Sequence, residues 1–304
     1  MKPSLQERYT GCLAGLAVGD AVGTTVEFKP RGSFPRVTDM VGGGPFALKA
    51  GQWTDDTSMA LCLGESLLAQ GGFDPRDQMG RYLNWWKWGY LSSTGTCFDI
   101  GMTVRDALER FERTGEPYSG SIDARAAGNG SLMRLVPVAL FYAPNIDEVV
   151  EFSARSSRTT HGAPEAMECC RLLGFVLARC LAGNLKHEAL DGSALPLQES
   201  KVSELAGGSY FEKSRDEVRG SGYAVASLEA ALWCFHTTTS FEAAVLDAAN
   251  LGEDADTTAA IVGQVAGAFY GCRGFRRHGW RSCIEERRFW GWRRGCSSRN
   301  RISG

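Results

Sequence analysis

Apolar residues recur at intervals of three and four along most of the chain, the spacing that places them on one face of an α-helix. This spacing predicts helices over residues 5–19, 59–68, 75–92, 103–113, 165–182, 224–236, 240–250 and 259–270. We find no convincing pair of strands, and no strong linker divides residues 5–271. The sequence therefore predicts a mostly α-helical fold in a single domain.

Glycine recurs at every fourth position in the first and in the last of these helices, at Gly11, Gly15, Gly19, Gly263, Gly267 and Gly271. A glycine in a helix costs about 1 kcal/mol relative to alanine, so six of them require compensation. We expect this compensation to be a close backbone approach between central helices. A membrane-type glycine face is not favoured, because Gln264 interrupts it and the segment is short for a membrane span.

Residues 29–52 are rich in glycine and proline, which predicts a long loop. Loops of this length in compact domains usually have a function or are disordered. This loop connects Glu27 to an acidic pair at residues 55 and 56, so we interpret it as an active-site flap. A second polar and poorly periodic segment, residues 184–221, is predicted to lie on the surface.

The composition is typical of a soluble globular protein, with 43% hydrophobic and 22% charged residues among 304. Neither an N-terminal signal nor a run of about 18 apolar residues is present, so we expect a cytoplasmic protein without a membrane span. The ten cysteines form no CxxC pair. Reduced and mostly buried thiols are therefore expected.

The net charge of −2 conceals an uneven distribution. Residues 273–304 contain ten arginines and only Glu285 and Glu286 as acids, a balance of +8, so residues 1–272 carry −10. An acidic body does not suit an enzyme with a nucleic-acid cleft, so nucleic acid is not an expected partner. The tail contains Trp280, Trp290 and Trp292 but no sustained apolar period. We interpret it as a reading-frame artefact, with a disordered peptide or a basic interaction tail as alternatives, and expect it to add nothing to the core.

The segment Gln52–Met59 places two adjacent carboxylates, Asp55 and Asp56, between Thr54 and Thr57 at the start of a helix. Acidic and hydroxyl side chains are common helix caps, and the macrodipole favours them there. Capping requires one oxygen, however, and this segment supplies four oxygen-bearing side chains in succession. Adjacent carboxylates repel each other unless a cation lies between them.

A second motif of the same kind begins about 200 residues later, where Asp254, Asp256 and Thr257 precede another apolar helix. All candidate ligands are hard oxygens, which favours Mg²⁺ or Mn²⁺ over Zn²⁺. Four carboxylates and two threonines can hold two ions, roughly 3.5–4 Å apart. Either motif alone is balanced against plain capping, but together they favour a metal site.

Three further positions could belong to a site. Residues 128–131 (Gly-Asn-Gly-Ser) form a glycine loop that is predicted to open a further helix, with Pro137 inside its apolar continuation. Backbone N–H groups of the loop could bind phosphate, although the loop matches neither the Walker loop nor the dinucleotide fingerprint. His161 and Asp99 each stand near a predicted helix start. For both, a structural role is an open alternative to a functional one.

Six segments in this order resemble the ADP-ribosylglycohydrolase family, in particular its bacterial branch related to the dinitrogenase reductase-activating glycohydrolase. They are GCLAGLAVGDAVGTTVEF, QWTDDTSMAL, GNGSLMR, TTHGAPEA, SGYAVASLEAALW and LGEDADTTAAIVGQVAGAFYG. The resemblance spans about residues 8–271 and implies a single-domain, all-α orthogonal helical bundle over residues 1–272 with a binuclear Mg²⁺ or Mn²⁺ cleft. Residues 273–304 match no family pattern.

The resemblance also implies roles for individual residues. The metal ligands would be Thr54, Asp55, Asp56, Asp254, Asp256 and Thr257. Asp99 matches the acid that lies near the scissile ribose, and Glu27 matches the acid that other branches use at a flap. The substrate-binding residues would be Gly128, Asn129, Gly130, Ser131 and His161 at the diphosphate and Tyr223 at the adenine.

The resemblance implies hydrolysis of ADP-ribosyl bonds, with ADP-ribosylarginine in proteins as the expected substrate and a monomer as the expected state. Cleavage at the ribose passes through an oxocarbenium-like state that a carboxylate can stabilise. Alternative substrates are serine-linked or other O- and N-linked ADP-ribose, ADP-ribosylated nucleic acid and small ADP-ribosyl metabolites. A non-catalytic ADP-ribose sensor and a crystallin-like structural protein are alternatives of another class.

Overall fold

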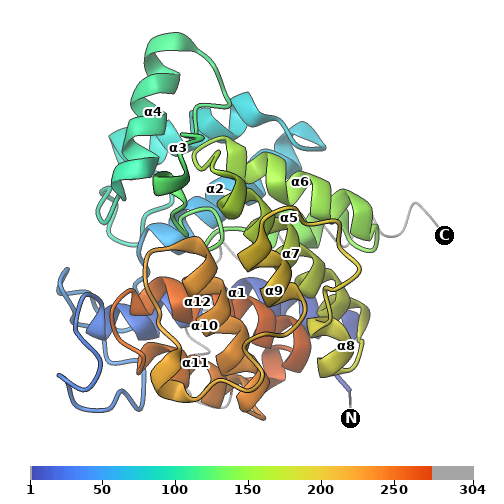
Figure 1. The fold of residues 1–304 in the computed structure, drawn as a ribbon. Coiled ribbons are helices and arrows are strands. Elements are labelled where there is room, and N and C mark those ends of the chain that lie inside the picture. The colour runs from blue at the N-terminus through green and yellow to red at the C-terminus, as the bar shows by residue number, and fades with distance from the viewer. Residues whose placement is uncertain (1, 276–304) are drawn as a thin grey trace.

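A computed structural model describes residues 2–275 and shows twelve α-helices and no β-strand among them (Figure 1). The helices are α1 (Leu5–Gly23), α2 (Asp55–Gln70), α3 (Pro75–Trp88), α4 (Met102–Thr114), α5 (Val136–Tyr142), α6 (Ile146–Arg158), α7 (Pro164–Ala182), α8 (Lys186–Leu190), α9 (Ser200–Ala206), α10 (Ala224–Thr237), α11 (Phe241–Ala249) and α12 (Ala255–Tyr270). Short 3₁₀ turns include η1 (Thr24–Val26) after α1 and η4 (Cys272–Gly274) after α12. The prediction of an all-α, single-domain fold is confirmed.

The glycine stripes lie where α1 and α12 cross at the centre of the molecule (Figure 1). A Cβ atom on Gly15 would lie 2.1 Å from the Gly263 carbonyl oxygen, and one on Gly19 would lie 2.0 Å from that of Ala259. The two helices run antiparallel, because contacts later in α1 fall earlier in α12. The predicted close backbone approach is confirmed. Gly271 has a different role: it is the C-cap of α12, with a positive φ of 70°.

This crossing decides where the functional side chains lie. The C-terminal end of α1 meets the N-terminal end of α12, since a Cβ on Gly23 would lie 2.3 Å from the Ala255 carbonyl oxygen. Helix α12 is buried from Ala255 through Ala268 and packs against α7, α10 and α11. Helix α2 packs between α3 and α5. The N-terminal end of α2 lies at the same place, since Thr54 contacts both Asp20 of α1 and Asp256 of α12. Three helix ends therefore meet in the interior.

Several boundaries differ from the sequence prediction. Helix α1 continues to Gly23, four residues beyond the predicted end, and α6 was not predicted. Helix α6 begins at an N-cap, Asn145, whose side chain accepts a hydrogen bond from the Glu148 N–H. The predicted surface segment 184–221 contains the short helices α8 and α9.

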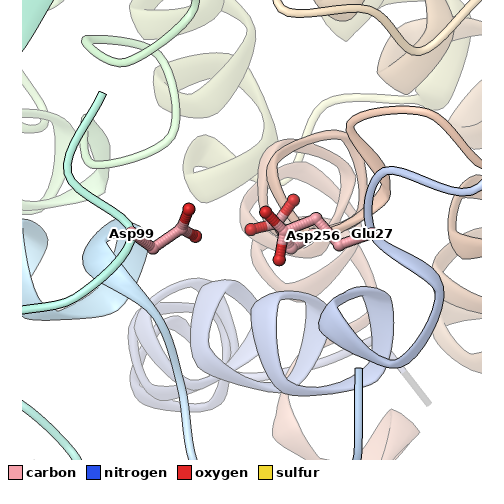
Figure 2. Close-up of side chains that lie close together, drawn as sticks. All are labelled: Glu27, Asp99 and Asp256. Atoms are coloured by element: carbon pink, nitrogen blue, oxygen red, sulfur yellow. The ribbon is translucent and has the colours of Figure 1, made fainter. Parts of the chain in front are cut away.

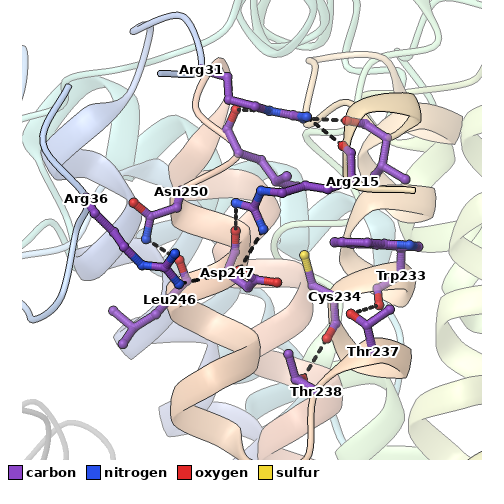
Figure 3. A network of polar contacts seen from close by, with 12 residues as sticks. Arg31, Arg36, Arg215, Trp233, Cys234, Thr237, Thr238, Leu246, Asp247 and Asn250 are labelled. Atoms are coloured by element: carbon purple, nitrogen blue, oxygen red, sulfur yellow. Dashed lines mark hydrogen bonds and ion pairs between the residues drawn. The ribbon is translucent and has the colours of Figure 1, made fainter. Parts of the chain in front are cut away.

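Residues 29–52 form an irregular loop, as predicted, but its first part is anchored. Arg31 donates hydrogen bonds to the carbonyl oxygens of Leu251 at 3.2 Å and Arg215 at 2.6 Å, and also to that of Val218 (Figure 3). The Asn250 amide accepts from the backbone N–H of residue 37 and donates to its carbonyl, at 2.8 and 2.9 Å. Residues 29–37 are thus fixed to the segments that precede α10 and α12. The interpretation of this loop as an active-site flap stays a prediction.

The chain beyond α12 enters the core for a few residues. Phe275 is fully buried, and its ring centroid lies 4.1 Å from that of Phe241. The expectation that the tail adds nothing to the core is therefore wrong at Phe275. The rest of the predicted tail, residues 276–304 with its three tryptophans, lies outside the described residues.

Two expectations from composition can be compared with the described residues. Six of the eight free cysteines in residues 2–275 are buried, as predicted. No helix in this range combines the length and apolar character that crossing a membrane requires.

Candidate metal centre and active site

Six carboxylates gather where α1, α2 and α12 meet, and we call them the acidic cluster: Glu27, Asp55, Asp56, Asp99, Asp254 and Asp256. Figure 2 shows the side chain of Asp99, from the loop before α4, pointing toward Asp256 and Glu27. Carboxylate oxygens of these three residues all lie within 4.8 Å of one another. Residues more than 200 positions apart in the sequence are therefore brought to one point.

The two acidic motifs also contact each other directly. The Thr54 hydroxyl lies 3.5 Å from Asp256 Oδ2, and the Thr257 hydroxyl lies 3.4 Å from Asp56 Oδ1. Each motif thus places a threonine beside a carboxylate of the other. The predicted ligand residues are together, although their roles as ligands remain a proposal.

Plain helix capping does not explain the motifs. Neither Thr54, the N-cap residue of α2, nor Asp254, that of α12, makes a side-chain capping hydrogen bond. Asp56 Oδ2 and Asp256 Oδ1 are buried and have no hydrogen-bond partner among the described residues. Buried carboxylate oxygens are expensive to leave unpaired, so these atoms require a cation or a proton.

The protonation of the cluster follows from burial and crowding. Burial, followed by repulsion from neighbouring carboxylates, raises the pKa of Asp55, Asp56 and Asp256 well above the usual range. The same causes raise the pKa of Asp99 to about 7 and that of Glu27 to about 9. A divalent cation would remove this penalty, and the oxygen-only donor set fits Mg²⁺ or Mn²⁺.

The backbone around the cluster is strained. Phe28, Asp99 and Glu253 have φ angles of 62°, 60° and 59°, in the left-handed region that non-glycine residues rarely adopt. A hydrogen bond of 2.7 Å from the Phe28 N–H to the Glu253 carbonyl joins two of these positions. Such strain is typical of functional sites, where the surrounding structure maintains it.

Asp20, in the last turn of α1, is a site residue that the sequence analysis missed. It is fully buried and accepts hydrogen bonds from both the backbone N–H and the hydroxyl of Thr54, at 2.9 and 3.0 Å, and of Thr57, at 3.1 and 2.6 Å. Asp20 therefore supplies the cap that α2 lacks locally. Burial, only partly offset by these four hydrogen bonds, raises its pKa to about 6.

A signal for Asp20 was present in the sequence. An acid in the last turn of an apolar helix opposes the macrodipole and requires a partner elsewhere. Here the partner is the N-terminus of α2. The arrangement leaves the carboxylates of Asp55 and Asp56 free for another role.

The glycine loop lies beside the acidic cluster. The Asn129 amide donates a hydrogen bond of 2.8 Å to Asp254 Oδ2, and its backbone N–H donates to the Gly222 carbonyl at 3.0 Å. The His161 ring faces the loop, since a Cβ on Gly130 would lie 2.8 Å from His161 Cε1. The three predicted substrate-binding segments are therefore neighbours: the glycine loop, His161 and the segment that contains Gly222 and Tyr223.

Two of the predicted substrate-binding side chains, Ser131 and Tyr223, are held by hydrogen bonds to neighbouring residues. The Ser131 hydroxyl is buried and accepts a hydrogen bond of 2.8 Å from Ser157, so its side chain belongs to the packing against α6. The Tyr223 ring is half-buried, and its hydroxyl donates to Glu165 at 2.5 Å. Lys201 donates to the same hydroxyl at 2.9 Å and also lies 3.2 Å from the Glu165 carboxylate. This fixes the orientation of the Tyr223 ring at the edge of the glycine loop.

Comparison with known proteins places this site in a family. The family model described as ADP-ribosylglycohydrolase matches residues 1–298. The chain belongs to the ADP-ribosylglycohydrolase family. The match extends beyond the predicted domain boundary at residue 272 and into the basic tail.

Individual relatives agree with the family assignment. The chain is 47% identical over 268 residues to a protein named ADP-ribosylarginine hydrolase Tri1 from Pseudomonas putida (strain GB-1), covering 88% of this chain and 72% of the relative. It is 33% identical to the ADP-ribosyl-[dinitrogen reductase] glycohydrolase of Rhodospirillum rubrum, covering 88% and 87%. A solved structure titled ADP-ribosylglycohydrolase-related protein complex superimposes with a TM-score of 0.82 at 41% identity and covers 99% of each chain. The predicted bacterial branch is confirmed.

Proposed function

We propose that the protein is a metal-dependent hydrolase that releases ADP-ribose from ADP-ribosylated arginine side chains. The observation that carries the proposal is the acidic cluster, with its two unpartnered buried oxygens, inside an ADP-ribosylglycohydrolase fold. The preference for arginine is supported by the relative named ADP-ribosylarginine hydrolase at 47% identity. Serine-linked and other O- or N-linked ADP-ribose are the alternative substrates.

The proposed cofactor is a pair of Mg²⁺ or Mn²⁺ ions held by six residues: Thr54, Asp55, Asp56, Asp254, Asp256 and Thr257. When bound, such ions can orient the ribose hydroxyls and lower the pKa of a water molecule. Asp20 orients one of these ligands, because it accepts the hydroxyl proton of Thr54 and so directs the lone pairs of that oxygen away from itself.

We propose Asp99 as the catalytic acid group next to the ribose, with Glu27 as a second candidate. A carboxylate near the anomeric carbon stabilises the positive charge that develops as the glycosidic bond breaks. Asp99 suits this role because its strained loop directs the carboxylate toward the cluster. Glu27 is more deeply buried, with an exposed fraction of 3%, which suits a role beside the ions.

The proposed substrate contacts follow the glycine loop. Backbone N–H groups of residues 128–131 and the ring of His161 would bind the diphosphate, and the Tyr223 ring would stack on the adenine. Backbone donors can hold two phosphate charges without a strongly basic cleft. This agrees with the acidic charge of residues 1–272.

The test is to incubate the purified protein with arginine- and serine-ADP-ribosylated peptides, in Mg²⁺ or in EDTA, and to measure released ADP-ribose. We expect release from the arginine peptide in Mg²⁺ and none in EDTA. Release from the serine peptide alone would move the assignment to the O-linked class. Binding of ADP-ribose by calorimetry with neither peptide cleaved would identify a sensor and contradict the proposal.

We also propose that the enzyme is a cytoplasmic monomer acting on ADP-ribosylated proteins. Its proposed catalytic domain is residues 1–272, followed by the basic segment 273–304. The absence of a membrane-crossing helix within residues 2–275 is consistent with this proposal.

A further inference from the structure

Arg134 is a fully buried charge that follows the glycine loop and has no salt bridge among the described residues. Its guanidinium lies over the Tyr82 ring, 4.5 Å from the centroid, and donates to Met59 Sδ at 3.7 Å. Its one short hydrogen bond goes to the Thr160 hydroxyl, at 2.6 Å. A buried arginine with mostly neutral partners is costly, so a function for it is expected.

The Thr160 hydroxyl is fully buried between two groups. Arg134 can only donate, so the Thr160 oxygen must accept from it. The hydroxyl proton then requires an acceptor of its own. The second polar atom within hydrogen-bond distance of this oxygen is His161 Nδ1, at 2.8 Å. Thr160 satisfies both requirements only if it accepts from Arg134 and donates to His161.

This order of donors decides the state of the His161 ring. Because Nδ1 accepts a hydrogen bond, it carries no proton, and the neutral ring must carry its proton on Nε2. The Nε2 atom faces the glycine loop: a Cβ on Gly128 would lie 3.4 Å from it, and one on Gly130 would lie 3.1 Å from it. The N–H of the ring is therefore directed at the loop.

We propose that Arg134 and Thr160 are positioning residues that fix His161 in its neutral, Nε2-protonated form, as a hydrogen-bond donor to an anionic oxygen bound at the glycine loop. Burial and the nearby charge of Arg134 agree with this, since they lower the pKa of His161 to about 3. The ring thus donates one fixed hydrogen bond at neutral pH rather than supplying a positive charge. The identity of the anion as a diphosphate rests on the proposed function.

The ring state can be measured without any substrate. The chain has four histidines, so a histidine-labelled sample gives few imidazole signals in a ¹H–¹⁵N correlation spectrum, and loss of one signal in His161→Gln assigns it. We expect His161 to be protonated on Nε2 alone and to stay so from pH 8 to pH 5. A proton on Nδ1, or titration to the doubly protonated ring within this range, would overturn the proposal.

Two variants test the relay itself. Thr160→Val removes the hydroxyl at nearly constant volume. In this variant we expect the His161 ring to be no longer protonated on Nε2 alone. Thr160→Ser keeps the hydroxyl and should retain the wild-type spectrum. An unchanged spectrum in Thr160→Val would exclude the relay. If that variant does not fold, loss of the Nε2 form in Thr160→Ser would count against the proposal, and the wild-type spectrum decides independently.

A binding measurement then tests the consequence. Calorimetry with ADP-ribose should show about tenfold weaker binding in Thr160→Val, as expected for a lost hydrogen bond to a charged group. Affinity for Mn²⁺ should stay within about twofold, which separates this effect from general damage to the site. Equal ADP-ribose affinity in both proteins would contradict the positioning role. If the wild type binds no ADP-ribose, the proposed function fails, while the spectrum still decides the state of the ring.

Discussion

Replacing Asp20 with asparagine tests the idea that a residue outside the ligand set holds the metal site in shape. The carboxylate accepts four hydrogen bonds, two each from Thr54 and Thr57. Asparagine keeps the size of the side chain, but one of its two polar atoms is an NH₂ group that cannot accept from an N–H. On that side the backbone hydrogen bond should therefore be lost, and the threonine hydroxyl can stay bonded only by reversing to accept from the NH₂ group.

The loss should affect metal binding more than folding. Residues that orient metal ligands typically change metal affinity by about 10–100-fold when replaced, and we expect Asp20→Asn to fall in this range. Burial has raised the pKa of Asp20 to about 6, so removing its charge also relieves a penalty. These two effects oppose each other. We therefore expect the melting temperature of the metal-free protein to change by less than about 4 °C, roughly 2 kcal/mol for a chain of this size.

The assay is calorimetric titration of Mn²⁺ into chelator-treated protein. Asp106→Asn is the matched control, because Asp106 is exposed on α4 and its replacement removes the same charge. We expect control affinity equal to that of the wild type and clearly weaker binding in Asp20→Asn. Affinity within about twofold of the wild type in Asp20→Asn would refute the reasoning.

Three further predictions concern the core and the cluster. Gly263→Ala should destabilise the protein by about 1–3 kcal/mol in urea denaturation, because its Cβ would lie 2.0 Å from the Gly15 carbonyl oxygen. Gly80→Ala in α3, whose Cβ meets nothing within 4 Å, should instead stabilise it by about 0.5–1 kcal/mol. The stability of the metal-free protein should fall as pH rises from about 5 to 9, because carboxyls with raised pKa keep protons that the unfolded chain has released. Saturating Mn²⁺ should remove this slope in thermal melts, and a metal-free stability that rose with pH would contradict the argument. Ending the chain at Gly271 should lower the melting temperature by more than about 4 °C, whereas a chain that ends after the buried Phe275 should melt at a higher temperature than the shorter one. Equal melting temperatures for the two truncated chains would count against the packing of Phe275.

The sequence predicted the elements of this fold better than their meeting points. Helices with a clear apolar period were found, and the glycine stripes correctly predicted the contact between α1 and α12. Helix α6 was missed, although its N-cap at Asn145 was a usable signal. Phe275 was missed because one buried ring produces no period in an arginine-rich segment.

The candidate site could be predicted only in part from local pattern. The two acidic motifs were recognisable because each crowds carboxylates and hydroxyls at a helix start. Capping remained an open alternative, since Asp20, which caps α2, lies 34 residues before Thr54 in the sequence. The relay from Arg134 through Thr160 to His161 joins residues up to 27 positions apart, a contact that no periodicity reports. Such contacts depend on how helices cross.

The most direct test of the central claim compares Asp256→Ala with Asp99→Asn. The claim is that the acidic cluster holds metal ions that hydrolysis requires, with Asp99 acting on the substrate. Metal content and release of ADP-ribose from an arginine-ADP-ribosylated peptide are measured for both variants and the wild type. We predict that Asp256→Ala loses metal and activity together, whereas Asp99→Asn keeps its metal and loses turnover. Hydrolysis at the wild-type rate by metal-free Asp256→Ala would contradict the account.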